Sequence, residues 1–207
     1  MTKPMVPNDA ELLRLTVAGD EHAFTALYRR HKGVVYRFAL LMSGQASIAE
    51  EVTQEVFLAL LRRAGRYDPA RGALTAYLCG AARNQVLLLM EKERPYVHLV
   101  EESDEGEAVP LAQLIAGGDP LSDCTRNEAN RLVRQAVLAL PARYREVIVL
   151  CDFQELSCAE AALALGCPVG TVNSRLHRGH ALLLKKLRAA ARLDPAASDA
   201  QGMRCFA

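Results

Sequence analysis

Hydrophobic positions recur at helical spacing along most of the chain, and the clearest apolar stripe lies in its C-terminal third. Apolar or small residues follow there at steps of four, three, four and four, the repeat of one buried helix face. These positions are Val172, Leu176, Gly179, Leu183 and Leu187. The opposite face carries polar and basic side chains near the N-terminal end, namely Asn173, Ser174, His177 and Arg178, with Arg175 at its flank. The pattern predicts an amphipathic helix with a basic outer face.

A shorter helix is predicted just before this one, separated from it by a tight turn. Ser157 and Glu160 have the spacing of a capping box, and Gly166 stands where a helix commonly ends. Pro168 suits the first turn of the following helix, where its missing N–H group costs nothing. Two helices in this order predict a helix-turn-helix, whose second helix lies in the DNA major groove. No acidic residue occurs between Glu160 and Asp194, which favours a polyanionic ligand over a merely solvated basic face.

Four further helices are predicted in the N-terminal half, from capping residues and apolar periodicity. In chain order, the first is capped by Asn8 with Glu11 and runs to Gly19, and the second is capped by Asp20 and runs through residue 42. The third begins at Ser47 with Glu50 and runs through Arg63. The fourth runs from about Thr75 to Glu93 and is ended by Pro95. A polar loop over 64–73 separates the last two. This block predicts a four-helix domain over 8–95.

The remainder of the chain predicts a second helical domain over 122–192. Its first helix is expected from about Ser122 to Leu140, followed by Pro141 and a helix through Val149, and then by the helix-turn-helix. Residues 96–121 are predicted to form a flexible linker, and residues 193–207 a disordered tail. The predicted fold class is therefore all-α, with two small helical domains.

Charge is distributed unevenly, although the formal net charge is only +1. Residues 1–95 hold 13 Lys and Arg against 10 Asp and Glu, and residues 122–194 hold 11 against 7. The linker between them holds six acidic residues and no basic one. Two mildly basic blocks joined by an acidic connector are a charge asymmetry that is typical of proteins that bind nucleic acid.

The cysteines and the hydropathy of the chain indicate a cytoplasmic protein. The six cysteines include no CxxC pair, the N-terminal segment resembles no signal peptide, and the longest aliphatic run is far too short to span a membrane. We therefore expect reduced thiols, with Cys151 and Cys158 packed as small hydrophobic side chains. The sequence also has no phosphate-binding loop, HExxH or GxSxG motif, so an enzyme is not expected.

Several motifs in this order resemble the extracytoplasmic-function (ECF) sigma factors of bacterial RNA polymerase. The strongest is LPARYREVIVLCDFQELSCAEAALALGCPVGTVNSRLHRGHALL over 140–183, which is similar to the promoter-reading region 4 of that family. IAEEVTQEVFLALL over 48–61 is similar to the polymerase-clamp contact of region 2. GDEHAFTALYRRHKGVVYRFAL over 19–40 and RYDPARGALTAYLCGAARN over 66–84 complete the region 2 pattern.

The resemblance implies a dissociable, non-enzymatic initiation subunit that binds core RNA polymerase and promoter DNA, as a monomer and without a cofactor or metal. Residues matching the reader of the upstream, minus-thirty-five element are Thr171, Asn173, Ser174, Arg175, His177 and Arg178. Residues matching the minus-ten, single-strand contact are Arg66, Tyr67, Arg71, Tyr77, Arg83 and Asn84. Residues matching the clamp contact are Glu51, Gln54 and Glu55. An anti-sigma factor is a further partner that the family implies.

Three alternatives remain open at this point. The clamp-contact residues are also typical of a solvated helix face. Tyr67 and Tyr77 are also typical of aromatic side chains that fill a core. His177 and His180 with Cys167 are a possible metal-binding group, and Cys158 or Cys205 is a possible redox or metal sensor. A metal-responsive thiol regulator is therefore an alternative to a sigma factor. A helix-turn-helix repressor is the third alternative, but such a protein usually carries a dimerisation element, and none is evident.

Overall fold

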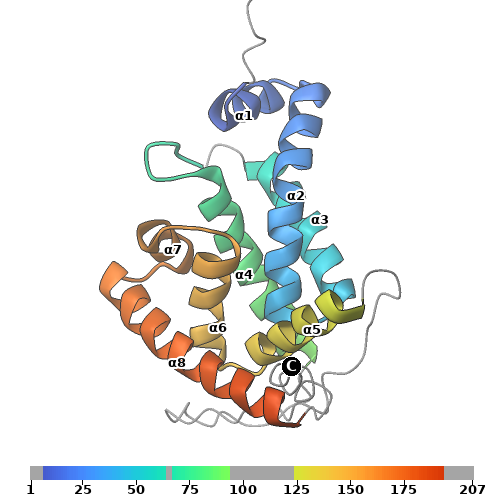
Figure 1. Ribbon diagram of the computed structural model, residues 1–207. Helices are drawn as coiled ribbons and strands as arrows, with labels where there is room; N and C mark the ends of the chain where they lie inside the picture. Colours follow the sequence, from blue (N-terminus) through green and yellow to red (C-terminus); the bar gives the residue numbers. More distant parts are fainter. Residues whose placement is uncertain (1–6, 64–66, 94–123, 194–207) are drawn as a thin grey trace, which may run out of the picture.

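The computed structural model describes residues 7–63, 67–93 and 124–193, and within these ranges the chain is helical and contains no strand. The elements are α1 (Asp9–Val17), α2 (Glu21–Ser43), α3 (Ala46–Arg63), α4 (Leu74–Glu93), α5 (Cys124–Leu138), α6 (Ala142–Ile148), the π-helical turn η3 (Val149–Phe153), α7 (Cys158–Leu165) and α8 (Val169–Leu193). The all-α prediction is confirmed (Figure 1). None of the described helices is both long and apolar enough to cross a membrane. The predicted linker over 96–121 and residues 194–207 of the predicted tail lie outside the described residues.

Local capping sets the helix boundaries of the first block. The Asn8 side chain accepts from the Glu11 N–H at 2.8 Å, and Asp20 accepts from the N–H groups at the start of α2, as predicted. Gly44 ends α2 in the left-handed conformation, with φ +78°. The predicted start of the third helix was slightly wrong. The chain is already helical from Ala46, so Ser47 lies inside α3 and does not cap it.

Helices α1 to α4 form the first block, in which α2 is the central element (Figure 1). Its apolar face, which includes Val35 and Phe38, is fully buried against α3 and α4. One polar contact lies among these apolar ones: buried His31 meets Asp9 of α1 at 2.9 Å. Burial of this continuous face, rather than helix propensity, holds the long helix in place.

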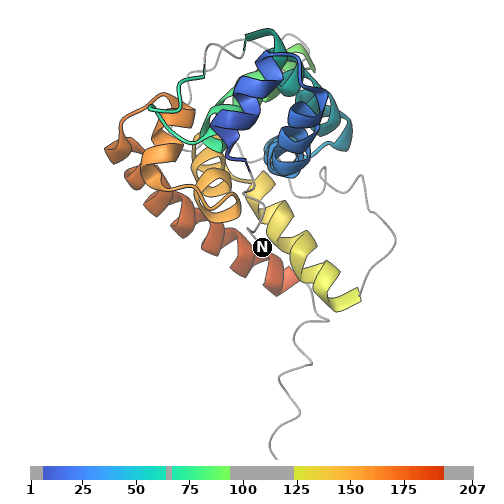
Figure 2. The same cartoon turned by 90° about the horizontal axis from the view of Figure 1, so that it is seen from above.

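Helices α5 to α8 form the second block. Figure 2 shows α5 and α8 running alongside each other, and α6 packs against α8 as well. The close approach of α6 and α8 depends on Gly179, because a Cβ atom there would lie 3.1 Å from Ile148 Cγ1. The sequence predicted a helix through Val149, but the chain continues through the wider turn η3 to Phe153 before α7 begins.

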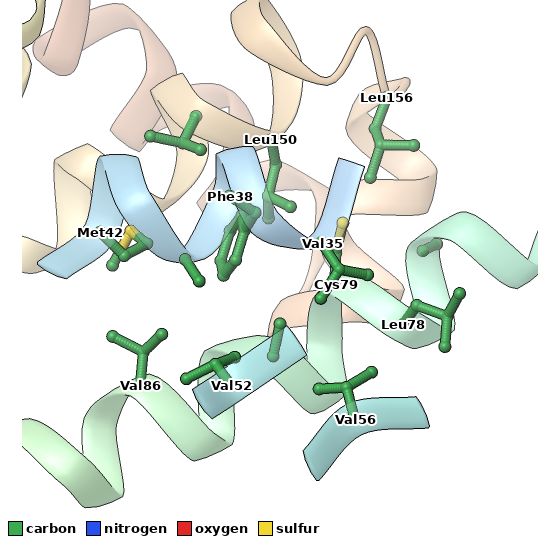
Figure 3. Packing of buried hydrophobic residues seen from close by; sticks show 14 of the residues in the cluster. Val35, Phe38, Met42, Val52, Val56, Leu78, Cys79, Val86, Leu150 and Leu156 are labelled. Carbon is green, nitrogen blue, oxygen red and sulfur yellow. The ribbon is translucent and has the colours of Figure 1, made fainter. Parts of the chain in front are cut away.

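The two blocks share one hydrophobic core, which the sequence did not predict. Figure 3 shows Leu150 and Leu156 of the second block beside Val35 and Phe38 of α2, with Cys79 of α4 nearby. All five side chains are buried. Burial raises the pKa of the Cys79 thiol to about 12, so this cysteine packs as an apolar side chain.

Candidate nucleic-acid interfaces

The helix-turn-helix predicted from capping residues is present. The Ser157 N–H donates to Glu160 Oε2 at 2.9 Å, and the Glu160 N–H donates to Ser157 Oγ at 3.3 Å, which completes the capping box. These bonds from Ser157 hold the pKa of the Glu160 carboxyl below its usual range. Gly166 ends α7 with φ +64°, a conformation that favours glycine. Pro168 stands just before α8 rather than in its first turn, and its carbonyl accepts from the Thr171 N–H at 2.9 Å.

Helix α8 presents the two faces that its periodicity predicted. Val172 and Gly179 are buried, and Leu176, Leu183 and Leu187 are half-buried along the same stripe. The opposite face is exposed at Asn173, Ser174, His177 and Arg178, while Thr171 and Arg175 are half-buried at its edges. Base edges and phosphates are read by side chains of these types on one helix face. This face is the first candidate site.

The charge on α8 suits a polyanion. Lys185, Lys186 and Arg188 continue the basic side beyond Arg178, and no described residue of α8 is acidic. Burial and the neighbouring Lys185 lower the pKa of Lys186. The Nε2 of His180 meets Asp152 Oδ2 of η3 at 2.8 Å. Among the described residues no group of three His, Cys, Asp or Glu side chains is placed to hold a metal ion.

A second candidate site lies where the 67–73 loop meets α4. Residues of the predicted minus-ten set line a hollow of about 420 Å³ there, namely Tyr67, Arg71, Tyr77 and Asn84. The two tyrosine rings lie 5.5 Å apart, and the Tyr67 hydroxyl donates to the Gly72 carbonyl at 3.0 Å. Burial, with Asp9 and Asp68 nearby, raises the pKa of Tyr67, so its hydroxyl stays protonated and donates. The site thus offers aromatic faces with a cation and an amide beside them.

The other two residues of the predicted minus-ten set are placed differently. Arg66 lies outside the described residues. Arg83 does not line the hollow, because its Nε donates to Glu146 Oε1 of α6 at 2.8 Å. The sequence offered no signal for this ion pair, because its partners are 63 positions apart and in different blocks.

A third candidate site lies between α2 and α3. Glu51 and Gln54 are exposed and Glu55 is half-buried, on the side of α3 opposite buried Val52 and Val56. Of the three predicted contact residues only Gln54 lines the neighbouring groove of about 610 Å³.

The floor of this groove is aromatic, which the sequence analysis missed. Tyr28 and Phe57 pack edge to face with ring centroids 4.8 Å apart, and Phe24 and Tyr36 also line the groove. The four-residue spacing of Phe24 and Tyr28, and of Lys32 and Tyr36, was the available signal, since such residues share one helix face. Leu61 at the groove edge is 43% exposed, so an apolar patch meets the polar side chains of α3 here.

Comparisons with known proteins agree with this arrangement. The family model described as Sigma-70 region 2 matches residues 27–95, and the one described as Sigma-70, region 4 matches residues 130–183. The chain is 33% identical over 172 residues to ECF RNA polymerase sigma factor SigW of Bacillus subtilis, covering 82% of this chain and 91% of that protein. It is also 33% identical over 183 residues to ECF RNA polymerase sigma factor SigM of Mycobacterium tuberculosis, covering 87% and 85% respectively.

Solved structures show the same fold. CnrH, in complex with the cytosolic domain of CnrY, superposes with a TM-score of 0.64 at 26% identity, covering 87% of this chain and 97% of that one. The sigma factor RpoE of Bartonella quintana, in complex with the anti-sigma factor NepR, superposes with a TM-score of 0.55 at 21% identity, covering 76% and 91%.

Proposed function

The chain belongs to the ECF sigma factors of the sigma-70 family, and we propose that its three candidate sites divide promoter recognition and polymerase binding among them. Like its relatives it is a non-enzymatic initiation factor that binds core RNA polymerase and directs it to promoters. The observation that carries the proposal is the exposed polar face at the start of α8, opposite an apolar stripe that is buried or half-buried.

The exposed face of α8 reads the upstream element as duplex DNA. A recognition helix contacts base edges through its N-terminal residues, which is where Asn173, Ser174, His177 and Arg178 lie. Thr171 and Arg175 flank them and are placed to contact the backbone. The basic residues further along α8 add attraction to phosphate that carries no sequence information.

The hollow beside α4 binds the minus-ten element as single-stranded DNA. An extruded base needs an aromatic or apolar pocket and hydrogen-bonding groups for its edge, and Tyr67, Tyr77 and Asn84 supply them. Arg71 lies beside them for the backbone, and we assign Arg66 and Arg83 the same task.

The exposed side of α3 contacts the polymerase clamp. Glu51, Gln54 and Glu55 provide polar contacts, and the aromatic groove beside Gln54 provides the apolar area that a stable interface needs. We also propose that the protein acts in the cytoplasm, where core polymerase is found, as a monomer and without a cofactor. CnrH, the structural relative at 26% identity, is seen with the cytosolic domain of CnrY, and we infer that a comparable anti-sigma partner binds this chain.

The decisive experiment is run-off transcription with purified core polymerase on genomic promoter fragments. Promoter-dependent transcripts are expected only when the chain is added. Failure to bind core polymerase would instead favour a helix-turn-helix repressor, and a requirement for zinc, copper or a thiol oxidant would favour a metal-responsive thiol regulator.

The upstream contact is tested separately with Arg178→Ala. Loss of one base or phosphate contact of this kind costs about 1–3 kcal/mol, so duplex binding is expected to weaken by about 5-fold to 150-fold while core binding is unchanged. Arg14→Ala removes the same charge from an exposed position on α1 and serves as the matched control. If Arg178→Ala weakened core binding as well, the assignment of this face would be wrong.

A further inference from the structure

We propose that Cys151 and Cys158 form a reversible disulfide bond when the protein meets a peroxide, and that this bond weakens the reading of upstream DNA by α8. The disulfide follows from the contacts of the two thiols and does not depend on what the protein binds. The effect on DNA rests on the proposed function of the α8 face. The two parts are therefore tested by separate measurements.

The turn between η3 and α7 brings the two cysteines together. Cys151 lies within η3, and Cys158 is the first residue of α7. The chain reverses between them, because the Leu156 N–H donates to the Leu150 carbonyl at 3.1 Å and Glu155 adopts a left-handed φ of +56°. Figure 3 shows both leucine side chains in the shared core, which anchors the base of the turn. The cysteines follow these leucines by one and two residues and are held close together.

The two thiols are in direct contact. The Cys151 and Cys158 side chains are hydrogen-bonded to each other. Both are half-buried at the edge of the core, so an oxidant as small as hydrogen peroxide reaches them from solvent. Cys79 differs, because it is fully buried and its pKa is raised by burial alone. A disulfide requires neighbouring side chains, and this pair already meets that requirement.

The surroundings of the pair set the order in which the sulfurs react. Burial, and after it the neighbouring Cys158, raises the pKa of the Cys151 thiol to about 12, so Cys151 is protonated at neutral pH. An oxidant is attacked by a thiolate and not by a thiol. Cys158 is therefore the sulfur that reacts first, and Cys151 is the sulfur that completes the bond.

The reaction consumes one peroxide and two thiols. The Cys158 thiolate attacks one peroxide oxygen, the O–O bond breaks, and the released hydroxide is protonated to water, which leaves a sulfenic acid on Cys158. The Cys151 sulfur then attacks the Cys158 sulfur, the S–O bond breaks, and the leaving hydroxide takes the Cys151 proton to form a second water. The two sulfurs lose two electrons, and the peroxide gains them. A small dithiol reverses the bond by exchange and is itself oxidised to a disulfide.

The bond affects the reading helix through Asp152. This residue follows Cys151 in η3, and its Oδ2 meets His180 Nε2 of α8 at 2.8 Å. Bonded sulfurs lie about 2.05 Å apart, closer than two thiols in hydrogen-bonding contact, so the disulfide draws η3 toward the start of α7. A hydrogen bond weakens steeply when its geometry is disturbed. His180 lies two positions after Arg178, so loss of this contact changes how the reading face is held.

The disulfide is tested on the full chain by peptide mapping. Reduced protein is treated with hydrogen peroxide, blocked with N-ethylmaleimide and digested with trypsin and Glu-C protease. Glu-C cleaves after Glu155, between the two cysteines, and after Glu160, before Cys167. Cys151 and Cys158 are expected on two peptides that remain linked until dithiothreitol is added. Recovery of both on separate peptides, whether blocked or oxidised to sulfinic acid, would overturn the proposal.

The effect on DNA is measured with holoenzyme assembled from peroxide-treated chain after the peroxide has been removed by catalase. Its binding to a fluorescein-labelled duplex, carrying the upstream element of a promoter that supports run-off transcription, is followed by anisotropy. Binding is expected to be about twofold to fivefold weaker than with reduced chain, as for the loss of one exposed charge pair. Unchanged affinity in the presence of the disulfide would overturn the effect on DNA.

Asp152→Asn tests the route from the disulfide to α8. This variant is expected to weaken duplex binding by the reduced chain to the same extent, and peroxide is then expected to have no further effect. If peroxide still weakened binding by the Asp152→Asn variant as much as in the wild type, the contact with His180 would not be the route.

Cys158→Ser and Cys167→Ser are the matched variants. Cys158→Ser keeps a small hydrogen-bonding group but cannot form the bond, so peroxide is expected to leave its duplex affinity unchanged. Cys167→Ser removes a half-buried thiol between α7 and α8, and its response to peroxide is expected to equal that of the wild type. A wild-type response in Cys158→Ser, with far-ultraviolet circular dichroism unchanged, would contradict the assignment. Peptide mapping involves neither DNA nor polymerase, so failure of run-off transcription alone would count against the proposed function and not against the disulfide.

Discussion

Arg145 offers a quantitative test of what holds the two blocks together. Its Nη1 donates to the Met42 carbonyl at 2.5 Å, and its Nη2 donates to the carbonyls of Leu138 and, at 2.9 Å, Leu140. Met42 and Leu138 lie in the last turns of α2 and α5, where carbonyls have no partner within the helix, and Leu140 follows α5 by two residues. Burial lowers the pKa of Arg145 to about 10, against the opposing effect of Glu146, yet the side chain stays charged at neutral pH.

Arg145→Met removes all three hydrogen bonds while keeping an unbranched side chain. At about 1 kcal/mol net for each bond, the loss of stability is expected to be about 3 kcal/mol. For a chain of this size that corresponds to a fall in Tm of about 6–12 °C. Arg145→Lys keeps the charge but not the planar fork, so its fall in Tm is expected to lie between those of the wild type and the methionine variant.

Differential scanning calorimetry at pH 7 measures these shifts. Arg134→Met is the matched control, because Arg134 is exposed on α5 and its replacement is expected to cost less than about 0.5 kcal/mol. A fall of less than about 2 °C for Arg145→Met would refute the reasoning, since the three carbonyls would then be satisfied equally well without the guanidinium.

Two further changes test the helix-turn-helix. Ser157→Ala is expected to cost about 1 kcal/mol in urea unfolding at pH 7. Ser157 depresses the folded-state pKa of Glu160, so its contribution to stability is present above the unfolded pKa near 4.3 and is lost as pH falls through the folded pKa. A difference in unfolding free energy between wild type and Ser157→Ala that stayed constant down to about pH 3 would contradict this reasoning. Gly179→Leu is expected to cost more than about 2 kcal/mol, because a Cβ at 179 already lies 3.1 Å from Ile148 Cγ1. Gly170→Ala is its control, and equal unfolding midpoints for the two variants would contradict the packing.

The helices and their caps could be predicted because their causes are local. Ser157 and Glu160 are three positions apart, and Asn8 and Glu11 likewise, so the hydrogen bonds form within one turn. The α8 stripe was equally predictable, because a 3.6-residue period assigns each side chain to a face regardless of what covers it. The start of α3 was misplaced by a similarly plausible cap at Ser47.

Features that depend on distant residues could not be predicted in this way. The extension of α6 into η3 depends on the packing of Val149 and Leu150 in the shared core, not on a local capping signal. The Arg83–Glu146 pair joins different blocks, so periodicity placed Arg83 correctly on α4 but was silent about its partner. The candidate sites also divide into parts with local causes and parts that depend on distant residues. Faces of single helices were predicted, whereas the wall that α7 contributes to the α4 pocket was not.

The shared core also bears on how this chain unfolds. Two domains with separate cores would melt independently, each with its own transition. Here Leu150 and Leu156 of the second block pack with Val35 and Phe38 of α2 in one buried cluster. Apolar surface of each block is therefore hidden by the other, and we expect the described chain to unfold as a single cooperative unit. Separating the two blocks would expose that surface, and a chain opened in this way would be the form most prone to aggregation and proteolysis.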